Sequence, residues 1–135
     1  MHSRRFTGRD LDILQILWNT SDSMTALEIV KQYPELTMNT VQAVLRKLLK
    51  EGLIKINRIV YSGTVLSRSF ASIISPEEFV ILQMKENVKE IDTVNKISFV
   101  TALFEDETDT EKALKEIEEL EAMLSEKKDM LKNKI

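Results

Sequence analysis

Cysteine is absent from the 135-residue sequence, so the chain can form neither a disulfide nor a thiolate metal site. Histidine occurs once, at His2, and the three glycines stand apart, so no nucleophile–base pair and no glycine-rich phosphate loop can be assembled. We therefore expect no enzymatic activity, no metal and no cofactor. Three glycines and two prolines are also few for an all-β fold with many turns, which favours a mainly helical chain.

Long apolar runs are missing as well. No stretch approaches the roughly 18 consecutive apolar residues that a membrane-spanning helix needs. The first residues are basic, but the apolar core of a signal peptide does not follow them. The sequence thus predicts a cytoplasmic protein with no membrane partner.

The net charge of −3 conceals an uneven distribution. Residues 1–75 contain ten Lys/Arg and six Asp/Glu, whereas residues 76–135 contain nine and sixteen. A basic first part joined to an acidic second part is typical of a protein that meets phosphate with one end only. Surface charge that segregates without functional meaning is the alternative interpretation.

Helix starts are marked by capping boxes, in which Ser or Thr is followed three residues later by Asp or Glu. Four such starts are present, at Thr7, Thr25, Ser75 and Thr108. Apolar spacing predicts helices over residues 8–19, 26–33 and 37–51 in the first half of the chain. After Gly52, β-branched residues predict strands over 53–61 and 64–73, joined by a tight turn. Three short helices followed by a hairpin indicate a winged helix-turn-helix.

Beyond residue 75 the chain returns to helical periodicity, over residues 76–91, 93–104 and about 109–133. The last segment has heptad spacing for only about three heptads, too few for an independent coiled coil but suited to interlocking with a partner chain. We expect a mainly α fold with a small β hairpin: a winged helix-turn-helix DNA-binding domain over 1–74 and a helical dimerisation region over 75–135. The expected dimerisation residues are Val100, Leu103, Phe104, Ile117, Leu120, Leu124 and Leu131.

The helix over residues 37–51 has two distinct faces. Val41, Val44, Leu45 and Leu48 recur at the spacing of a buried face. The opposite face carries Asn and Gln, which can bond adenine bidentately, Arg, which can do so with guanine, and a small Ala that permits close approach. The candidate base-reading residues are Asn39, Thr40, Gln42, Ala43 and Arg46. A solvated face of an ordinary helix is the alternative.

Several other cations are placed to hold the DNA backbone. Arg58 and Arg68 lie in the predicted hairpin, which would be the wing, and its uncharged turn allows only modest contacts at the tip. Two lysines lie toward the end of the third helix, and one arginine begins the first. The candidate backbone-binding residues are Arg9, Lys47, Lys50, Arg58 and Arg68. For the two hairpin arginines, a role as cross-strand surface residues is the alternative.

These segments resemble the penicillinase-repressor family of transcriptional regulators. The resemblance runs through Leu11–Trp18, Thr25–Val30, Thr40–Ile54, Ser67–Phe70 and Ser75–Phe79, and Thr40–Ile54 is its most specific part. It implies a dimer with N-terminal winged helices and C-terminal interlocking helices that represses genes by occupying palindromic operators. It also places Asn39, Thr40, Gln42 and Ala43 where the family reads bases.

Two features of that family are not matched. Its antibiotic-responsive members are cleaved at an Asn-Phe bond in the dimerisation region, where this chain has Ala102-Leu103, so induction by that cleavage is not expected. A regulatory protease, if there is one, is not identified. Copper-responsive relatives end in Cys-x-Cys motifs, which this chain lacks.

The sequence therefore predicts a homodimeric, sequence-specific DNA-binding repressor whose partners are an inverted-repeat operator in duplex DNA and a second copy of itself. The rival hypothesis is a winged-helix protein–protein interaction module that does not bind DNA directly. The operator sequence, the regulated genes and the inducing signal do not follow from the sequence.

Overall fold

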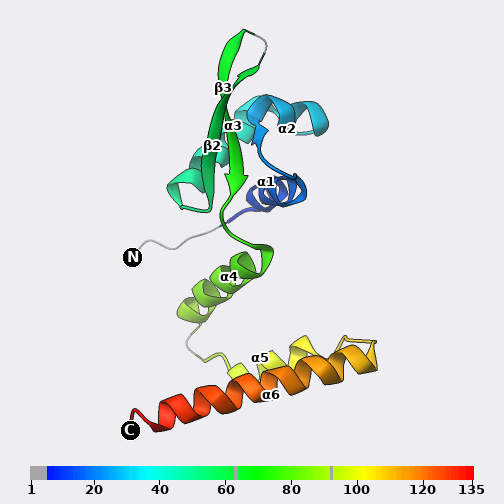
Figure 1. The fold of residues 1–135 in the computed structure, drawn as a ribbon, viewed down its shortest axis with the longest axis vertical. Coiled ribbons are helices and arrows are strands. Elements are labelled where there is room, and N and C mark those ends of the chain that lie inside the picture. The colour runs from blue at the N-terminus through cyan, green and yellow to red at the C-terminus, as the bar shows by residue number, and fades with distance from the viewer. Residues whose placement is uncertain (1–5, 63, 92) are drawn as a thin grey trace. The chain divides into compact units, whose positions relative to one another are not determined.

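The computed structural model describes residues 6–62, 64–91 and 93–135. The chain divides into two compact units, one ending at Glu90 and the other beginning at Ile91 (Figure 1). The first unit contains α1 (Gly8–Asn19), β1 (Met24–Thr25), α2 (Ala26–Gln32), α3 (Met38–Lys50), β2 (Ile54–Ser62), β3 (Val65–Ser72) and α4 (Pro76–Glu90). The second contains α5 (Lys96–Leu103) and α6 (Thr110–Lys132). The predicted mainly α winged-helix fold is confirmed.

Reciprocal caps fix the starts of α1, α2 and α4. Thr7 and Thr25 each form a complete capping box, and Ser75 and Glu78 exchange the same pair of hydrogen bonds at the start of α4. The predicted box at Thr108 is wrong by one residue. The N-cap of α6 is Asp109, whose carboxylate accepts from the backbone N–H of Lys112, because a carboxylate satisfies the same orphan donors.

The three strands form one antiparallel sheet in the order β1-β3-β2. Strand β1 was not predicted, because two residues are too few to show an alternating pattern. It pairs with β3 at Ser69 and Phe70 only, so the rest of the β2–β3 hairpin extends as a two-stranded ribbon (Figure 1). This hairpin is the wing. Its register shifts between Ile56 and Arg58, which leaves Asn57 as an extra residue in β2.

The core of the first unit is made by apolar side chains from α1, α2, α3, the sheet and the start of α4. Phe79 of α4 is 2% exposed and meets Trp18 edge-to-face at 5.9 Å and Phe6 at 5.3 Å between ring centroids. Trp18 Nε1 donates to the backbone oxygen of Ile74 at 2.8 Å. These contacts extend the compact unit past the predicted boundary at residue 74. The functional division there, into DNA-binding and dimerisation regions, stays a prediction.

Within the described ranges, no helix has both the length and the apolar character that crossing a bilayer requires.

Candidate nucleic-acid interface

The two faces of α3 lie as its periodicity predicts. Val41, Val44, Leu45 and Leu48 are buried in the core of the first unit. Asn39, Gln42, Ala43 and Arg46 are exposed on the other side. Thr40 is half-buried, and its hydroxyl accepts from the hydroxyl of the N-cap residue Thr37 at 2.9 Å. Four of the five candidate base-reading residues are therefore open to solvent, and Thr40 is tied to the helix start.

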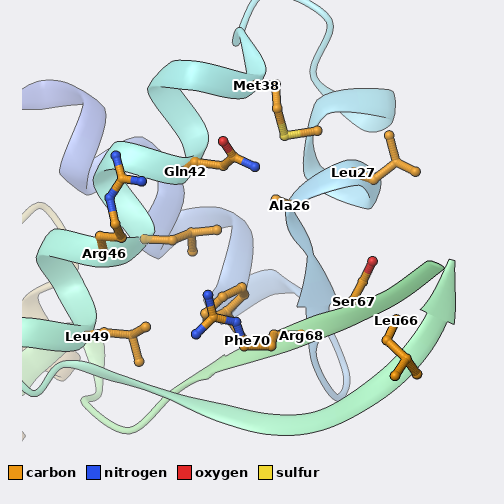
Figure 2. Close-up of a pocket in the computed structure, with 11 residues that line it drawn as sticks. Ala26, Leu27, Met38, Gln42, Arg46, Leu49, Leu66, Ser67, Arg68 and Phe70 are labelled. Atoms are coloured by element: carbon orange, nitrogen blue, oxygen red, sulfur yellow. The ribbon is translucent and has the colours of Figure 1, made fainter.

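A hollow of about 380 Å³ lies between α2, α3 and β3; we call it the helix–wing groove. Gln42 and Arg46 extend around it from α3, and Leu66 and Arg68 from β3 (Figure 2). Its remaining lining residues are Ala26, Leu27, Met38, Leu45, Leu49, Ser67 and Phe70. Among the described residues that line it there are two guanidinium groups and no carboxylate.

Three side chains that line the groove, Gln42, Arg46 and Arg68, are of types that can bind nucleic acid. A guanidinium binds phosphate oxygens bidentately, and a carboxamide and a guanidinium can both read base edges. The structure brings Gln42 and Arg46 together with Arg68, whereas Asn39 and Ala43 do not line the groove. Leu66 and Ser67 were missed by sequence reasoning. The alternation of β3 places Leu66 on the same face as Arg68 and the buried Phe70, so its position could have been inferred once the strand was known.

Lys47, a predicted backbone-binding residue, is engaged inside the protein. Its Nζ donates to Oδ2 of Asp10 at 2.6 Å and lies 5.5 Å from the centroid of the Phe6 ring. Asp10 is 2% exposed and also accepts from the backbone N–H of Thr7 at 2.7 Å. The ion pair therefore ties the start of α1 to the second half of α3.

The other predicted backbone-binding residues differ in their surroundings. Arg58 forms an ion pair with Asp22 on the surface. Arg9 lies 3.5 Å from Asp12, one turn along α1, in an exposed pair of the kind that contributes little to stability. Lys50 and Arg68 are exposed. Arg68 alone among the five lines the groove next to the base-reading candidates.

The second unit contains no buried residue among those described. Of the predicted dimerisation residues, Phe104 and Leu120 are half-buried, and Val100, Leu103, Ile117, Leu124 and Leu131 are exposed. Other apolar side chains outside that set are exposed too, namely Ile97, Phe99, Leu114, Met123 and Met130. A pair of helices with this much exposed apolar surface is typical of an association surface.

A winged helix whose α3 presents polar and basic side chains beside a basic wing defines a class of DNA-binding regulators. The chain belongs to the penicillinase repressor family, which matches residues 6–126. It is thus a DNA-binding transcriptional regulator of a repressor family. The members of that family are regulators and not enzymes.

Comparison with curated protein sequences gives no match. Among solved structures, the chain is similar to the transcriptional regulator BldR from Sulfolobus solfataricus, with 15% identity and a TM-score of 0.39 over 87% of this chain and 75% of that one. A similarity this low supports no argument about the site.

Proposed function

We propose that the chain is a homodimeric repressor that binds an inverted-repeat operator. The observation that carries the proposal is the helix–wing groove, where Gln42 and Arg46 of the exposed α3 face lie with Arg68 of the wing and none of the described lining residues is a carboxylate. In a winged helix, the exposed face of the recognition helix enters the major groove with its N-terminal residues toward the bases. Asn39, Gln42, Ala43 and Arg46 would then read bases, and Thr40 would hold the helix start.

Phosphate contacts are proposed for Arg68, Lys50 and Arg9. Arg68 faces the same hollow as the base-reading candidates, and Lys50 is exposed one turn beyond Arg46. Lys47 is not included, because its ammonium group already pairs with the nearly buried Asp10. Arg58 is considered separately below, since it too is paired within the protein.

Dimerisation is proposed for the region from residue 75 onward, through the apolar faces of α5 and α6. These helices expose side chains such as Leu103, Leu124 and Leu131 that a second copy would cover. A symmetric dimer presents two recognition helices related by a two-fold axis, and an operator with inverted half-sites repeats that symmetry. Repression would follow from occupation of the operator, which blocks access of the polymerase.

The test is a fluorescence anisotropy titration of the full chain against two duplexes at a series of salt concentrations. One duplex carries an inverted repeat from the DNA upstream of the protein's own gene, and the other is a random sequence of equal length. We expect tighter binding to the first, and an affinity for both that falls steeply with salt as counterions are released. Failure to bind either duplex at low salt would contradict the proposal and favour the protein–protein module.

A further inference from the structure

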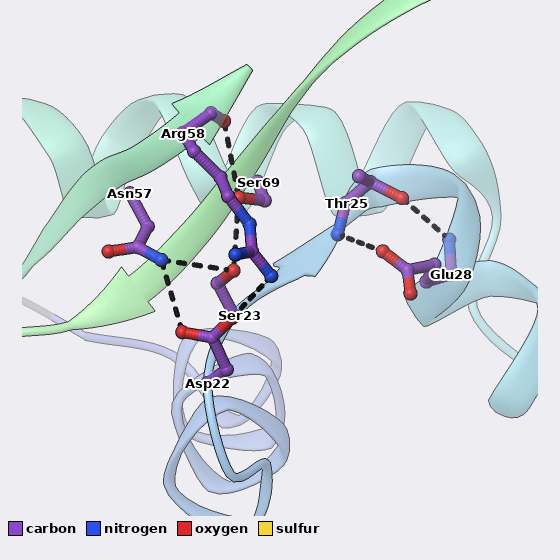
Figure 3. A network of polar contacts seen from close by, with 7 residues as sticks. All are labelled: Asp22, Ser23, Thr25, Glu28, Asn57, Arg58 and Ser69. Carbon is purple, nitrogen blue, oxygen red and sulfur yellow. Dashed lines mark hydrogen bonds and ion pairs between the residues drawn. The ribbon is translucent and has the colours of Figure 1, made fainter. Parts of the chain in front are cut away.

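The base of the wing is held by a polar cluster that we call the wing bracket, made of Asp22, Ser23, Asn57, Arg58 and Ser69. The Arg58 guanidinium pairs with the Asp22 carboxylate, and Asn57 Nδ2 donates to Asp22 Oδ1 at 3.2 Å and to Ser23 Oγ at 3.3 Å (Figure 3). Ser23 Oγ donates to Ser69 Oγ at 3.0 Å, and Ser69 Oγ donates to the backbone oxygen of Arg58 at 3.2 Å. The bracket therefore joins β2 and β3 to the segment that leads into β1.

A β-bulge makes the bracket possible. Ile56 pairs with Phe70 and Arg58 pairs with Ser69, so Asn57 has no partner in the register. In a regular strand, consecutive side chains point to opposite faces, whereas a bulge allows two neighbouring side chains to reach the same side. Asn57 and Arg58 both reach Asp22 as a result.

The bracket lies where the wing loses its third strand. Strand β1 pairs with β3 only at Ser69 and Phe70, so residues 59–62 and 65–68 form a ribbon of two strands. A two-stranded hairpin without further support is marginally stable. Strand β2 ends at Ser62, which is four residues and roughly 13 Å beyond Arg58. If the ribbon tilted by about 10° at the bracket, its far end would move by about 2 Å.

The two arginines of the wing lie on opposite faces of the ribbon. Arg58 of β2 is paired with Ser69 of β3, and paired residues point to the same face of the ribbon. Arg68 is the neighbour of Ser69 along β3 and therefore points to the opposite face. Arg68 lines the helix–wing groove, whereas Arg58 lines a separate hollow with Ser23, Thr25 and Ser69. Only Arg68 is on the side from which α3 presents Gln42 and Arg46.

We propose that Arg58 and Asp22 act on DNA binding by positioning the wing, and that Arg58 does not itself hold a phosphate. This proposal rests on the proposed function, because the wing position matters only if DNA lies against α3 and Arg68 together. The bracket fixes the direction of the ribbon at its last supported point and so places Arg68 against the DNA strand that α3 reads.

Substitution of Asp22 separates the two roles by the sign of its effect. Asp22→Ala removes a negative charge and frees the Arg58 guanidinium, so a phosphate-binding Arg58 would then bind DNA more tightly. A positioning role predicts weaker binding, because the wing loses its anchor. Asp106→Ala, which removes the same charge from the connector of the second unit, is the matched control and should leave the affinity unchanged.

The DNA experiment uses the full chain, the upstream duplex and a salt series. We expect Asp22→Ala and Arg58→Ala each to weaken binding about five- to twentyfold, and the double variant to be no worse than either single variant, because both break one unit. The slope of log affinity against log salt concentration should be unchanged in Asp22→Ala. In Arg68→Ala its magnitude should fall by about one, the contribution of one phosphate contact. Tighter binding by Asp22→Ala, or additive losses in the double variant, would overturn the proposal.

Amide hydrogen exchange without DNA tests the bracket by itself. Asp22→Ala and Arg58→Ala should speed exchange in residues 59–62 and 65–68 and leave α3 unchanged, and unchanged exchange in the ribbon would overturn the proposal. The Asp22 and Arg58 side chains are 51% and 60% exposed, so both variants should fold. If one of them does not fold, Asn57→Ala takes its place, because it removes two hydrogen bonds of the bracket. If the wild-type chain binds no duplex, the proposed function fails and the DNA role of the bracket with it, while exchange still reports whether the bracket holds the wing.

Discussion

Lys47 and Lys50 are three residues apart on α3, yet their surroundings differ. The Lys47 ammonium group lies 2.6 Å from a carboxylate oxygen of Asp10, which is 2% exposed, whereas Lys50 extends into solvent. Removing one member of a buried ion pair leaves the other charge without compensation, and the loss is largest when the remaining group is the more buried one.

Lys47→Ala should therefore lower the free energy of unfolding by roughly 2–4 kcal/mol, somewhat below the range for fully buried pairs because Lys47 is partly exposed. Lys50→Ala is the matched control and should change it by less than about 0.5 kcal/mol. Urea denaturation followed by circular dichroism measures both. Equal stabilities of the two variants would mean that the Asp10 carboxylate finds compensation elsewhere.

Gln42 and Lys50 are expected to differ in the sequence dependence of their contributions to DNA binding. Gln42→Ala should cost roughly 1–3 kcal/mol on the operator and little on random duplex, because a carboxamide that reads a base edge contributes only where that base is present. Lys50→Ala should weaken both duplexes alike and lower the salt slope by about one. Competition titrations give both ratios, and an equal loss on the two duplexes for Gln42→Ala would remove it from the base-reading set.

At the scale of single residues, the sequence predicted the exposed face of α3 but not the ion pairs of Lys47 and Arg58. The buried positions of α3 recur every three or four residues, which fixes where Gln42 and Arg46 must point. The partners of Lys47 and Arg58 are more than 30 residues away in the chain, and nothing in local spacing selects Asp10 or Asp22 as the carboxylate that each one meets.

At the scale of elements, α4 starts as part of the winged helix. Its buried residue, Phe79, packs against the rings of Trp18 and Phe6, and Trp18 donates to the backbone just before the helix. The sequence predicted α4 from its cap and apolar spacing but did not indicate which neighbours it packs on. That information depends on tertiary contacts between residues about 60 to 70 positions apart.

Phe79→Ala should therefore destabilise the first unit by about 3–5 kcal/mol, the usual loss when a buried Phe is truncated. Lys85→Ala, an exposed change later on the same helix, should stay within about 0.5 kcal/mol of the wild type. Thermal unfolding monitored by Trp18 fluorescence reports on this unit, because Trp18 is the single tryptophan. A Phe79→Ala variant as stable as the Lys85→Ala variant would place α4 outside the folding unit of the winged helix.

At the scale of the whole molecule, the two units differ in how much of their apolar surface is buried. The first has its own core, which includes the fully buried Ile13, Val41 and Leu48. The second has no buried residue among those described and exposes apolar side chains along both of its helices. Heptad spacing predicted α6 and its apolar residues, but a single chain cannot reveal the register in which a second copy would cover them.

The proposed dimer is tested by placing a charge on the exposed apolar face of α6. Leu124 is 57% exposed, so Leu124→Asp should leave the helix folded and yet prevent a second copy from covering that face. Leu120→Asp, one turn earlier on the same face, should do the same. Ala122 lies on the opposite side of α6 at helical spacing, so Ala122→Asp adds the same charge and should leave the dimer intact.

Sedimentation equilibrium then gives the mass of each variant, and operator titrations give its affinity. We expect the two leucine variants to be monomers that bind the inverted repeat no better than a single half-site, because the second recognition helix is no longer held at a high effective concentration. The Ala122→Asp variant should keep the mass and the affinity of the wild type. A dimer that survives both leucine substitutions would place the interface on other residues of the chain.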